Sequence, residues 1–280
     1  MKRDQLIGAN FSFQHFPIEL TVQSLRKMGF ERLELWGIAP HLDLFHNQNQ
    51  RLDGLRTLLC DCGMTVHCFT PEQVFYPVNI ASGDPSYRQA SVRRFLKAAD
   101  IAAELGASYL FLTPGRGFET ETSEHALANS LQSLSQIAAH AQSLGIRCLL
   151  EPLQRAESNI VNNLAGLTQL WRDLNADNVD IVLDLVAMAT AGDRVADYID
   201  SFGTRLAHVH VADGTPAGHL VWGDGQLPLG QYLDELSRAQ FKGTLTFEPF
   251  GNGSYALDPV ATWRRSLSAV SPYVDGVELS

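Results

Sequence analysis

Short apolar runs alternate with longer amphipathic stretches along this chain of 280 residues. The short runs are rich in leucine, β-branched and aromatic residues, which is typical of buried strands. The longer stretches repeat their apolar positions every three or four residues, which predicts helices. The predicted strands span residues 5–10, 32–36, 64–69, 108–113, 146–151, 179–184, 205–211 and 243–248. The predicted helices span about 17–28, 48–62, 85–105, 121–144, 163–175, 189–202, 228–240 and 256–270.

Start and stop signals support these helices. Before 85–105, Asp84 is a suitable N-cap and Pro85 suits the first helical position. Four predicted helices end on a glycine that is followed by an apolar residue at the start of a strand. These glycines are Gly29, Gly63, Gly106 and Gly145. Their spacing is the length of one strand-plus-helix unit, so the chain repeats a βα pattern.

Eight such units follow one another without a linker or a low-complexity stretch. The pattern predicts a single (β/α)₈ TIM barrel that occupies residues 1–280 as one domain. The alternative is a doubly wound open sheet. That fold favours a glycine-rich phosphate loop after the first strand, and the sequence there, Gly8-Ala9-Asn10-Phe11-Ser12, is not of this kind.

Acidic or imidazole side chains stand at the ends of the last four predicted strands. These residues are Glu151, Asp184, His210 and Glu248. In a TIM barrel the carboxyl ends of the strands meet at one face, which carries the active site. Carboxylates with one imidazole suit a hard-to-borderline divalent cation. The sequence therefore predicts a metal site, and Mn²⁺, Co²⁺, Mg²⁺ and Zn²⁺ all remain open.

The two glutamates are more informative than the aspartate. An aspartate at a strand end is often only the N-cap of the next helix, and Asp184 has this alternative. Glu151 and Glu248 each precede a proline, which keeps the glutamate extended. His208 lies two residues before His210 and faces the same side of the strand, so it is expected to support the site from one layer deeper. Asp213 is expected to orient an imidazole.

Charge and composition exclude some functions. The formal net charge of −10 disfavours general binding to nucleic acid. No run of about 18 apolar residues and no signal-peptide pattern is present, so we expect a cytoplasmic protein without a membrane partner. None of the four lysines ends a predicted strand, which leaves a Schiff-base mechanism without a nucleophile. They are Lys2, Lys27, Lys97 and Lys242.

Several motifs resemble the xylose-isomerase-like barrel superfamily of sugar isomerases and epimerases, and within it the fructoselysine 3-epimerase branch. The resemblance covers essentially the full chain. It rests on Glu34-Leu35-Trp36-Gly37, Pro40-His41, Thr70-Pro71-Glu72, Glu151-Pro152-Leu153, Glu157-Ser158-Asn159, Leu183-Asp184, His208-Val209-His210, His219 before Gly223-Asp224-Gly225, and Phe247-Glu248-Pro249.

The resemblance implies that Glu151, Asp184, His210 and Glu248 bind one divalent metal ion. It also implies that Glu151 and Glu248 serve as the acid/base pair in C3 epimerisation through an enediolate. The substrate is then a small sugar or sugar amine, and we expect a homo-oligomer. The residues expected to bind substrate are Glu157, Trp36, His41, Glu72 and His219.

The chain also departs from the epimerases of free ketohexoses. It has Ala187 and Pro216 where those enzymes carry a histidine and an arginine, which argues against a bare ketohexose. An aldose–ketose isomerase or a sugar dehydratase could use the same metal ligands. A non-catalytic sugar-binding protein and an endonuclease-type phosphodiesterase are the more remote alternatives, and the acidic charge disfavours the second.

Overall fold

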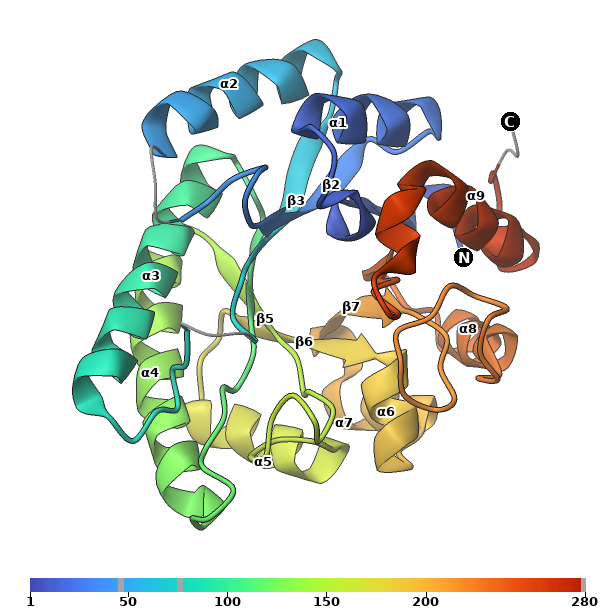
Figure 1. Cartoon of the computed structure of the whole chain (residues 1–280). Coiled ribbons are helices and arrows are strands. Elements are labelled where there is room, and N and C mark those ends of the chain that lie inside the picture. Colours follow the sequence, from blue (N-terminus) through green and yellow to red (C-terminus); the bar gives the residue numbers. More distant parts are fainter. Residues whose placement is uncertain (45–47, 75–77, 278–280) are drawn as a thin grey trace.

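The computed structural model describes residues 1–44, 48–74 and 78–277, and it shows a barrel of parallel strands surrounded by helices (Figure 1). The eight strands form one sheet in the order β1-β2-β3-β4-β5-β6-β7-β8. Their bounds are β1 Gly8–Ala9, β2 Arg32–Gly37, β3 Thr65–Pro71, β4 Tyr109–Leu112, β5 Arg147–Leu150, β6 Val179–Asp184, β7 Leu206–Val211 and β8 Thr244–Phe247. The predicted TIM barrel is confirmed.

The sheet closes between its first and last strands. The backbone N–H of Ile7 donates to the carbonyl of Leu245 at 2.9 Å, and Leu6 pairs with Leu245 in a parallel bridge. The first strand is shorter than predicted, because residues Arg3–Gln5 form a 3₁₀ turn that precedes it. This closure brings the carboxyl ends of all eight strands to one rim.

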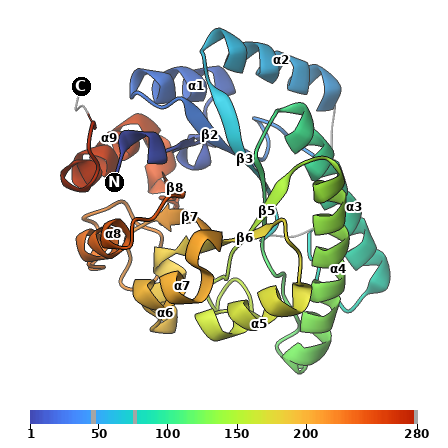
Figure 2. The same cartoon turned by 180° about the vertical axis from the view of Figure 1, so that it is seen from behind.

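The helices cover the outside of the barrel, as Figure 2 shows from behind. Their bounds are α1 Ile18–Lys27, α2 Gln48–Asp61, α3 Pro85–Glu104, α4 Ser123–Ser143, α5 Leu164–Leu174, α6 Leu185–Ala191, α7 Val195–Phe202, α8 Leu229–Arg238 and α9 Pro259–Val270. Among the helices in the described ranges, none combines the length and the hydrophobicity that a membrane-spanning helix requires.

One predicted helix is wrong. Residues 189–202 are not continuous, because Gly192 adopts the left-handed conformation with φ 75° and ends α6. A new helix, α7, then begins at Val195. The other signals agree with the structure: the Asp84 carboxylate accepts from the Ser86 N–H at 2.8 Å at the start of α3.

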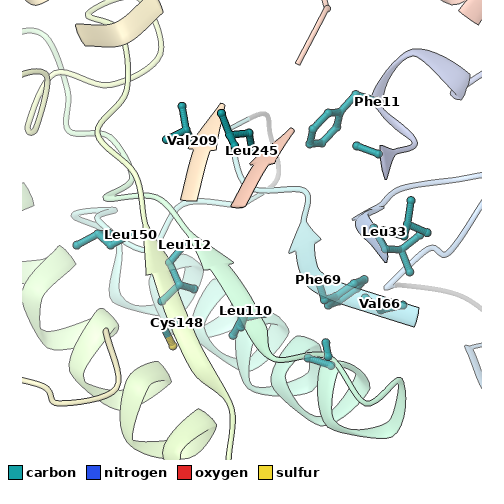
Figure 3. Close-up of a cluster of buried hydrophobic side chains, with 14 of the residues drawn as sticks. Phe11, Leu33, Val66, Phe69, Leu110, Leu112, Cys148, Leu150, Val209 and Leu245 are labelled. Carbon is teal, nitrogen blue, oxygen red and sulfur yellow. The ribbon is translucent and has the colours of Figure 1, made fainter. Parts of the chain in front are cut away.

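Alternate residues of each strand face either the helices or the barrel interior. The outward side chains form the large core between strands and helices, which Figure 3 shows around Leu110, Leu112, Cys148 and Leu150. The inward side chains are of two kinds. A small apolar cluster fills the side of β3 to β6 and consists of Cys68, Phe111, Leu149 and Val182. Polar residues fill the side of β2, β7 and β8, namely Glu34, His208, His210, Thr244 and Thr246.

Candidate metal centre and substrate cavity

The structure brings together the four side chains that the sequence predicts as metal ligands. Glu151 follows β5, Asp184 ends β6, His210 belongs to β7 and Glu248 follows β8. Each offers one ligand atom, and these atoms all lie within 4.8 Å of one another. Asp184 and His210 are also direct partners in the register of β6 and β7. Strand ends that lie far apart in the sequence therefore converge on one point of the rim.

His210 and His219 lie at the centre of this cluster. Nδ1 of His210 is 2.8 Å from Oε1 of Glu151 and 3.2 Å from Oε2 of Glu248. Nε2 of His219 is 3.4 Å from Oδ2 of Asp184 and 3.2 Å from Oε2 of Glu248. Glu151, Asp184 and His210 are buried, and the Glu248 side chain is only 12% exposed. Three carboxylates thus share a small volume that is largely shielded from solvent.

The polar atoms in this cluster fit a divalent cation. Oε1 of Glu151, Oδ2 of Asp184 and Nδ1 of His210 are buried, and none of them forms a well-directed hydrogen bond with another described residue, although Nδ1 of His210 and Oε1 of Glu151 lie only 2.8 Å apart. Buried polar atoms are normally paired, so three unpaired ligand atoms at one point call for a missing partner. Oxygen and imidazole nitrogen ligands suit Mn²⁺, Co²⁺, Mg²⁺ or Zn²⁺.

Asp184 has two roles at once. One carboxylate oxygen, Oδ1, accepts a hydrogen bond from the N–H of Ala187 and caps α6. The other, Oδ2, is one of the three unpaired atoms of the cluster. The capping alternative raised by the sequence is therefore compatible with metal binding, because a carboxylate can use its two oxygens separately.

Without a cation, protons balance the crowded carboxylates. Burial raises the pKa of Glu151 to about 8. Burial also disfavours the charged form of Glu248, but the positive charges of His210 and His219 outweigh it and lower the pKa of Glu248 to about 2. A bound divalent cation would supply the positive charge that protons supply in its absence.

A cavity of about 380 Å³ lies next to this cluster. Its aromatic walls come from Phe11, Trp36, Phe111 and Phe250. Its acidic lining consists of Glu72, Glu151, Glu157, Asp184 and Glu248. No lysine or arginine is found among the described residues that line it. The arrangement is a polar floor with apolar walls, as expected for a small-molecule site.

Comparison with known proteins identifies the family of this barrel. A family model described as "Xylose isomerase-like TIM barrel" matches residues 22–272. The chain belongs to this family. The resemblance predicted from the sequence is therefore confirmed.

Several curated proteins that are similar to this chain are sugar epimerases. Fructoselysine 3-epimerase of Escherichia coli O157:H7 is 25% identical over 237 residues, which cover 84% of this chain and 86% of that protein. Ketose 3-epimerase of Arthrobacter globiformis is 26% identical over 245 residues, or 86% and 80% of the two chains. The crystal structure of 3-keto-D-glucoside 4-epimerase from E. coli superposes with a TM-score of 0.80 at 19% identity, over 95% of this chain and 98% of that one. The predicted enzyme class, a carbohydrate epimerase or isomerase, is confirmed.

Four of the predicted substrate-binding residues line the cavity: Trp36, Glu72, Glu157 and His219. The indole N–H of Trp36 donates to Oε2 of Glu72 at 3.0 Å. The Glu157 carboxylate accepts from the N–H of Gln154 at 3.1 Å, and burial raises the pKa of Glu157. These contacts fix the positions of polar groups at the cavity wall.

His41 does not fit the predicted role. It is buried away from the described lining of the cavity. Its Nε2 lies 2.8 Å from the carbonyl oxygen of Phe16, and its Nδ1 lies 2.7 Å from Nδ2 of Asn10. Both ring nitrogens are thus used inside the protein. The loop after β2 turns this side chain into the core, a direction that sequence spacing does not specify.

Asp213 also has a different environment from the one predicted. Its carboxylate accepts hydrogen bonds from the backbone N–H groups of Gly214, Gly223 and Leu227, at 2.8 to 2.9 Å. These bonds organise the loop between β7 and α8, which carries His219. In the described part of the chain, the recorded hydrogen bonds of Asp213 go to backbone atoms and not to an imidazole.

Sequence reasoning noted Glu34 in the motif Glu34-Leu35-Trp36-Gly37 but gave it no role at the metal centre, which it supports from below. It is fully buried in the middle of β2, and its carboxylate lies 3.1 Å from Nε2 of His208 and 3.3 Å from Nε2 of His210. His208, the predicted supporting residue, is thus linked to His210 by Glu34, which lies within hydrogen-bond distance of both. A glutamate between Leu33 and Leu35, both outward-facing core residues, is the signal that could have indicated an inward-facing charge.

Proposed function

We propose that the protein is a divalent-metal-dependent sugar epimerase that inverts C3, the carbon next to the ketone, of a ketose or of a ketosamine such as fructoselysine. The observation that carries the proposal is the convergence of Glu151, Asp184, His210 and Glu248 on one point at the edge of a sugar-sized cavity. The curated relatives named as 3-epimerases of fructoselysine and of ketoses support the same reaction.

Glu151 and Glu248 are the proposed acid/base pair. Epimerisation next to a ketone removes a proton from one face of the carbon, leaves a planar enediolate and returns a proton to the other face. The two carboxylates come from β5 and β8, and each has a second oxygen that is free to move a proton. When bound, a divalent cation supplies positive charge for the oxyanion that develops, which contributes several kcal/mol. Exclusion of water by the aromatic walls strengthens this electrostatic stabilisation.

The charge of the cavity favours substrates without a phosphate group. Besides the three carboxylates at the proposed metal centre, Glu72 and Glu157 add acidic groups to the described lining. Phosphate is normally bound by arginine, lysine or helix N-termini. A neutral sugar, or one that carries an amine, avoids the repulsion that a phosphate would meet here. Ala187, which also lines the cavity, leaves room beside Asp184.

The test is turnover in deuterium oxide. The Mn²⁺-loaded protein is incubated with unphosphorylated ketoses, with fructoselysine and with the phosphorylated ketoses, and the products are analysed by NMR. We expect inversion at C3, incorporation of one deuterium at that carbon, and no turnover of the phosphorylated sugars. A change in the position of the carbonyl would instead establish an aldose–ketose isomerase, and loss of water would establish a dehydratase. Turnover without deuterium would indicate hydride transfer.

A further inference from the structure

Glu34 is the hub of a buried polar network beneath the metal centre. Oε1 of Glu34 accepts from the hydroxyl of Thr70 at 2.7 Å. Oε2 lies 3.1 Å from Nε2 of His208, and both oxygens lie 3.3 Å from Nε2 of His210. Glu34, His208 and His210 are each 0% exposed. The strands of Glu34 and the two histidines are not neighbours, since β8 and β1 lie between β7 and β2.

The donors around Glu34 fix the protons of both imidazoles. An ionised carboxylate only accepts hydrogen bonds, so the Nε2 atoms of His208 and His210 must both carry a proton to bond with it. Three donors on one carboxylate in turn stabilise its charge. Each neutral imidazole with a proton on Nε2 has a free lone pair on Nδ1.

The hydrogen bonds beyond His208 also point toward Glu34, from donor to acceptor. Nδ1 of His208 lies 2.7 Å from the Thr244 hydroxyl, which therefore donates to it. The Thr244 oxygen is then free to accept from Nε2 of His67 at 3.2 Å. Nδ1 of His67 lies 3.5 Å from the guanidinium of Arg32, a group that can only donate. Each group from Arg32 to Glu34 thus donates a hydrogen bond to the next one, and no two donors or two acceptors face each other along the series.

The hydrogen bonds of Glu34 determine how the His210 ring faces the metal centre. Because Glu34 holds a proton on Nε2, Nδ1 is the ring atom of His210 that faces Glu151 and Glu248 and that can exchange its proton for a cation. The ring also stacks on Phe111 with a centroid separation of 5.1 Å and an interplanar angle of 10°, which restrains its rotation. The proton on Nε2 and the plane of the ring are then both fixed before any ion arrives.

We propose that Glu34 is a positioning residue of the metal centre, which prepares His210 to bind the cation through Nδ1. The inference rests on the proposed metal-dependent function, because it assigns a task to Glu34 only if a cation binds at His210. Partners of this kind, beyond the ligands themselves, typically change metal affinity by about 10- to 100-fold.

The experiment measures binding of Zn²⁺ alone, without a sugar, to three purified proteins: the wild type, Glu34→Gln and Glu104→Gln. Glu104 is an exposed residue at the end of α3 and serves as the matched control for loss of one carboxylate. Glutamine keeps the shape of Glu34 but replaces one acceptor oxygen by a donor. We expect affinity to fall about 10- to 100-fold in Glu34→Gln and to stay unchanged in Glu104→Gln, with circular dichroism spectra that match the wild type.

A second measurement does not depend on the folding of a variant. Long-range ¹H–¹⁵N NMR of histidine-labelled, zinc-loaded wild-type protein is expected to show His210 with its proton on Nε2 and the metal on Nδ1.

Thr70→Val, which removes one donor to Glu34 and keeps the carboxylate, is expected to weaken zinc binding less than Glu34→Gln does.

The outcomes separate this inference from the proposed function. Unchanged zinc affinity in Glu34→Gln, or a His210 that binds zinc through Nε2, overturns the role of Glu34 and leaves the metal centre intact. A wild-type protein that binds no divalent cation overturns both. A wild type that binds zinc as described but epimerises no sugar retains the role of Glu34 and contradicts only the assigned reaction.

Discussion

Nε2 of His219 lies 3.2 Å from Oε2 of Glu248, although the two residues belong to different loops of the barrel. Glu248 directly follows β8, whereas His219 lies within the long segment between β7 and α8. The segments also meet through the backbone, where the N–H of Gly251 donates to the carbonyl of His219 at 2.8 Å. The loop before α8 therefore places an imidazole against one of the two proposed acid/base residues.

The position of His219 depends on Asp213. Replacing Asp213 by alanine removes the acceptor for three backbone N–H groups of this loop, and Asp213 is only 2% exposed. We expect the free energy of unfolding to fall by about 1–3 kcal/mol, because buried donors lose their partner. We also expect a lower kcat/KM, since His219 loses its support. Denaturant unfolding and steady-state kinetics check the two effects, and wild-type values for both would contradict the role given to Asp213.

The proposed acid/base pair gives a sharper catalytic prediction. Glu151→Gln and Glu248→Gln should each lower kcat by several orders of magnitude, because an amide cannot carry the proton. The exposed Glu104→Gln variant is the control and should keep the wild-type rate. The measurement is product formation from the substrate that the deuterium oxide experiment identifies. A Gln variant at either position with near wild-type turnover would refute the two-carboxylate scheme.

Metal removal should affect stability as well as activity. The three carboxylates and His210 come together in one site only when the chain is folded. A cation that binds this site therefore binds only the folded state and stabilises that state by mass action. At a Mn²⁺ concentration 100 times Kd, the gain is about 2.7 kcal/mol. Thermal unfolding after chelator treatment, with and without added Mn²⁺, should show a higher Tm with the ion. Asp184→Asn, which alters one proposed ligand, should reduce that difference; an equal Tm shift in this variant would argue against binding at Asp184.

His41 should matter for stability rather than for substrate affinity. Burial lowers the pKa of His41 below its usual value of 6.5, so the folded protein keeps this ring neutral. As the pH falls below about 6.5, the unfolded chain binds a proton that the folded chain does not, and the free energy of unfolding falls. This contribution reaches up to about 1.4 kcal/mol per pH unit and ends at the folded pKa.

His41→Gln should therefore show a shallower loss of stability between about pH 6.5 and 5 than the wild type, with an unchanged KM. The exposed His125→Gln is the matched control and should leave the slope as it is. Urea unfolding across this pH range tests the slope. A raised KM in His41→Gln, with no change in the slope, would restore the substrate-binding role predicted from the sequence.

Periodicity and punctuation in the sequence were sufficient for the barrel. Each strand and helix is coded locally, by alternating apolar runs and by caps such as Asp84 and Gly106, and the βα repeat leaves few ways to arrange the elements. The candidate ligands could be predicted for the same reason, since a residue that ends a parallel strand must lie at the common rim. The error in the helix at 189–202 arose where a single residue, Gly192, interrupts a continuous apolar pattern.

Sequence alone thus determined the eight strands, most of the helices, their order and the rim on which Glu151, Asp184, His210 and Glu248 stand. Only the tertiary structure decided where the loop residues point: His41 into the core, Asp213 toward backbone amides and His219 toward Glu248. It also decided that Glu34 meets His210, because β2 and β7 approach each other only when the sheet closes. The physical reason is that strand direction follows from local periodicity, whereas contacts across the barrel and within loops depend on the packing of segments distant in the chain.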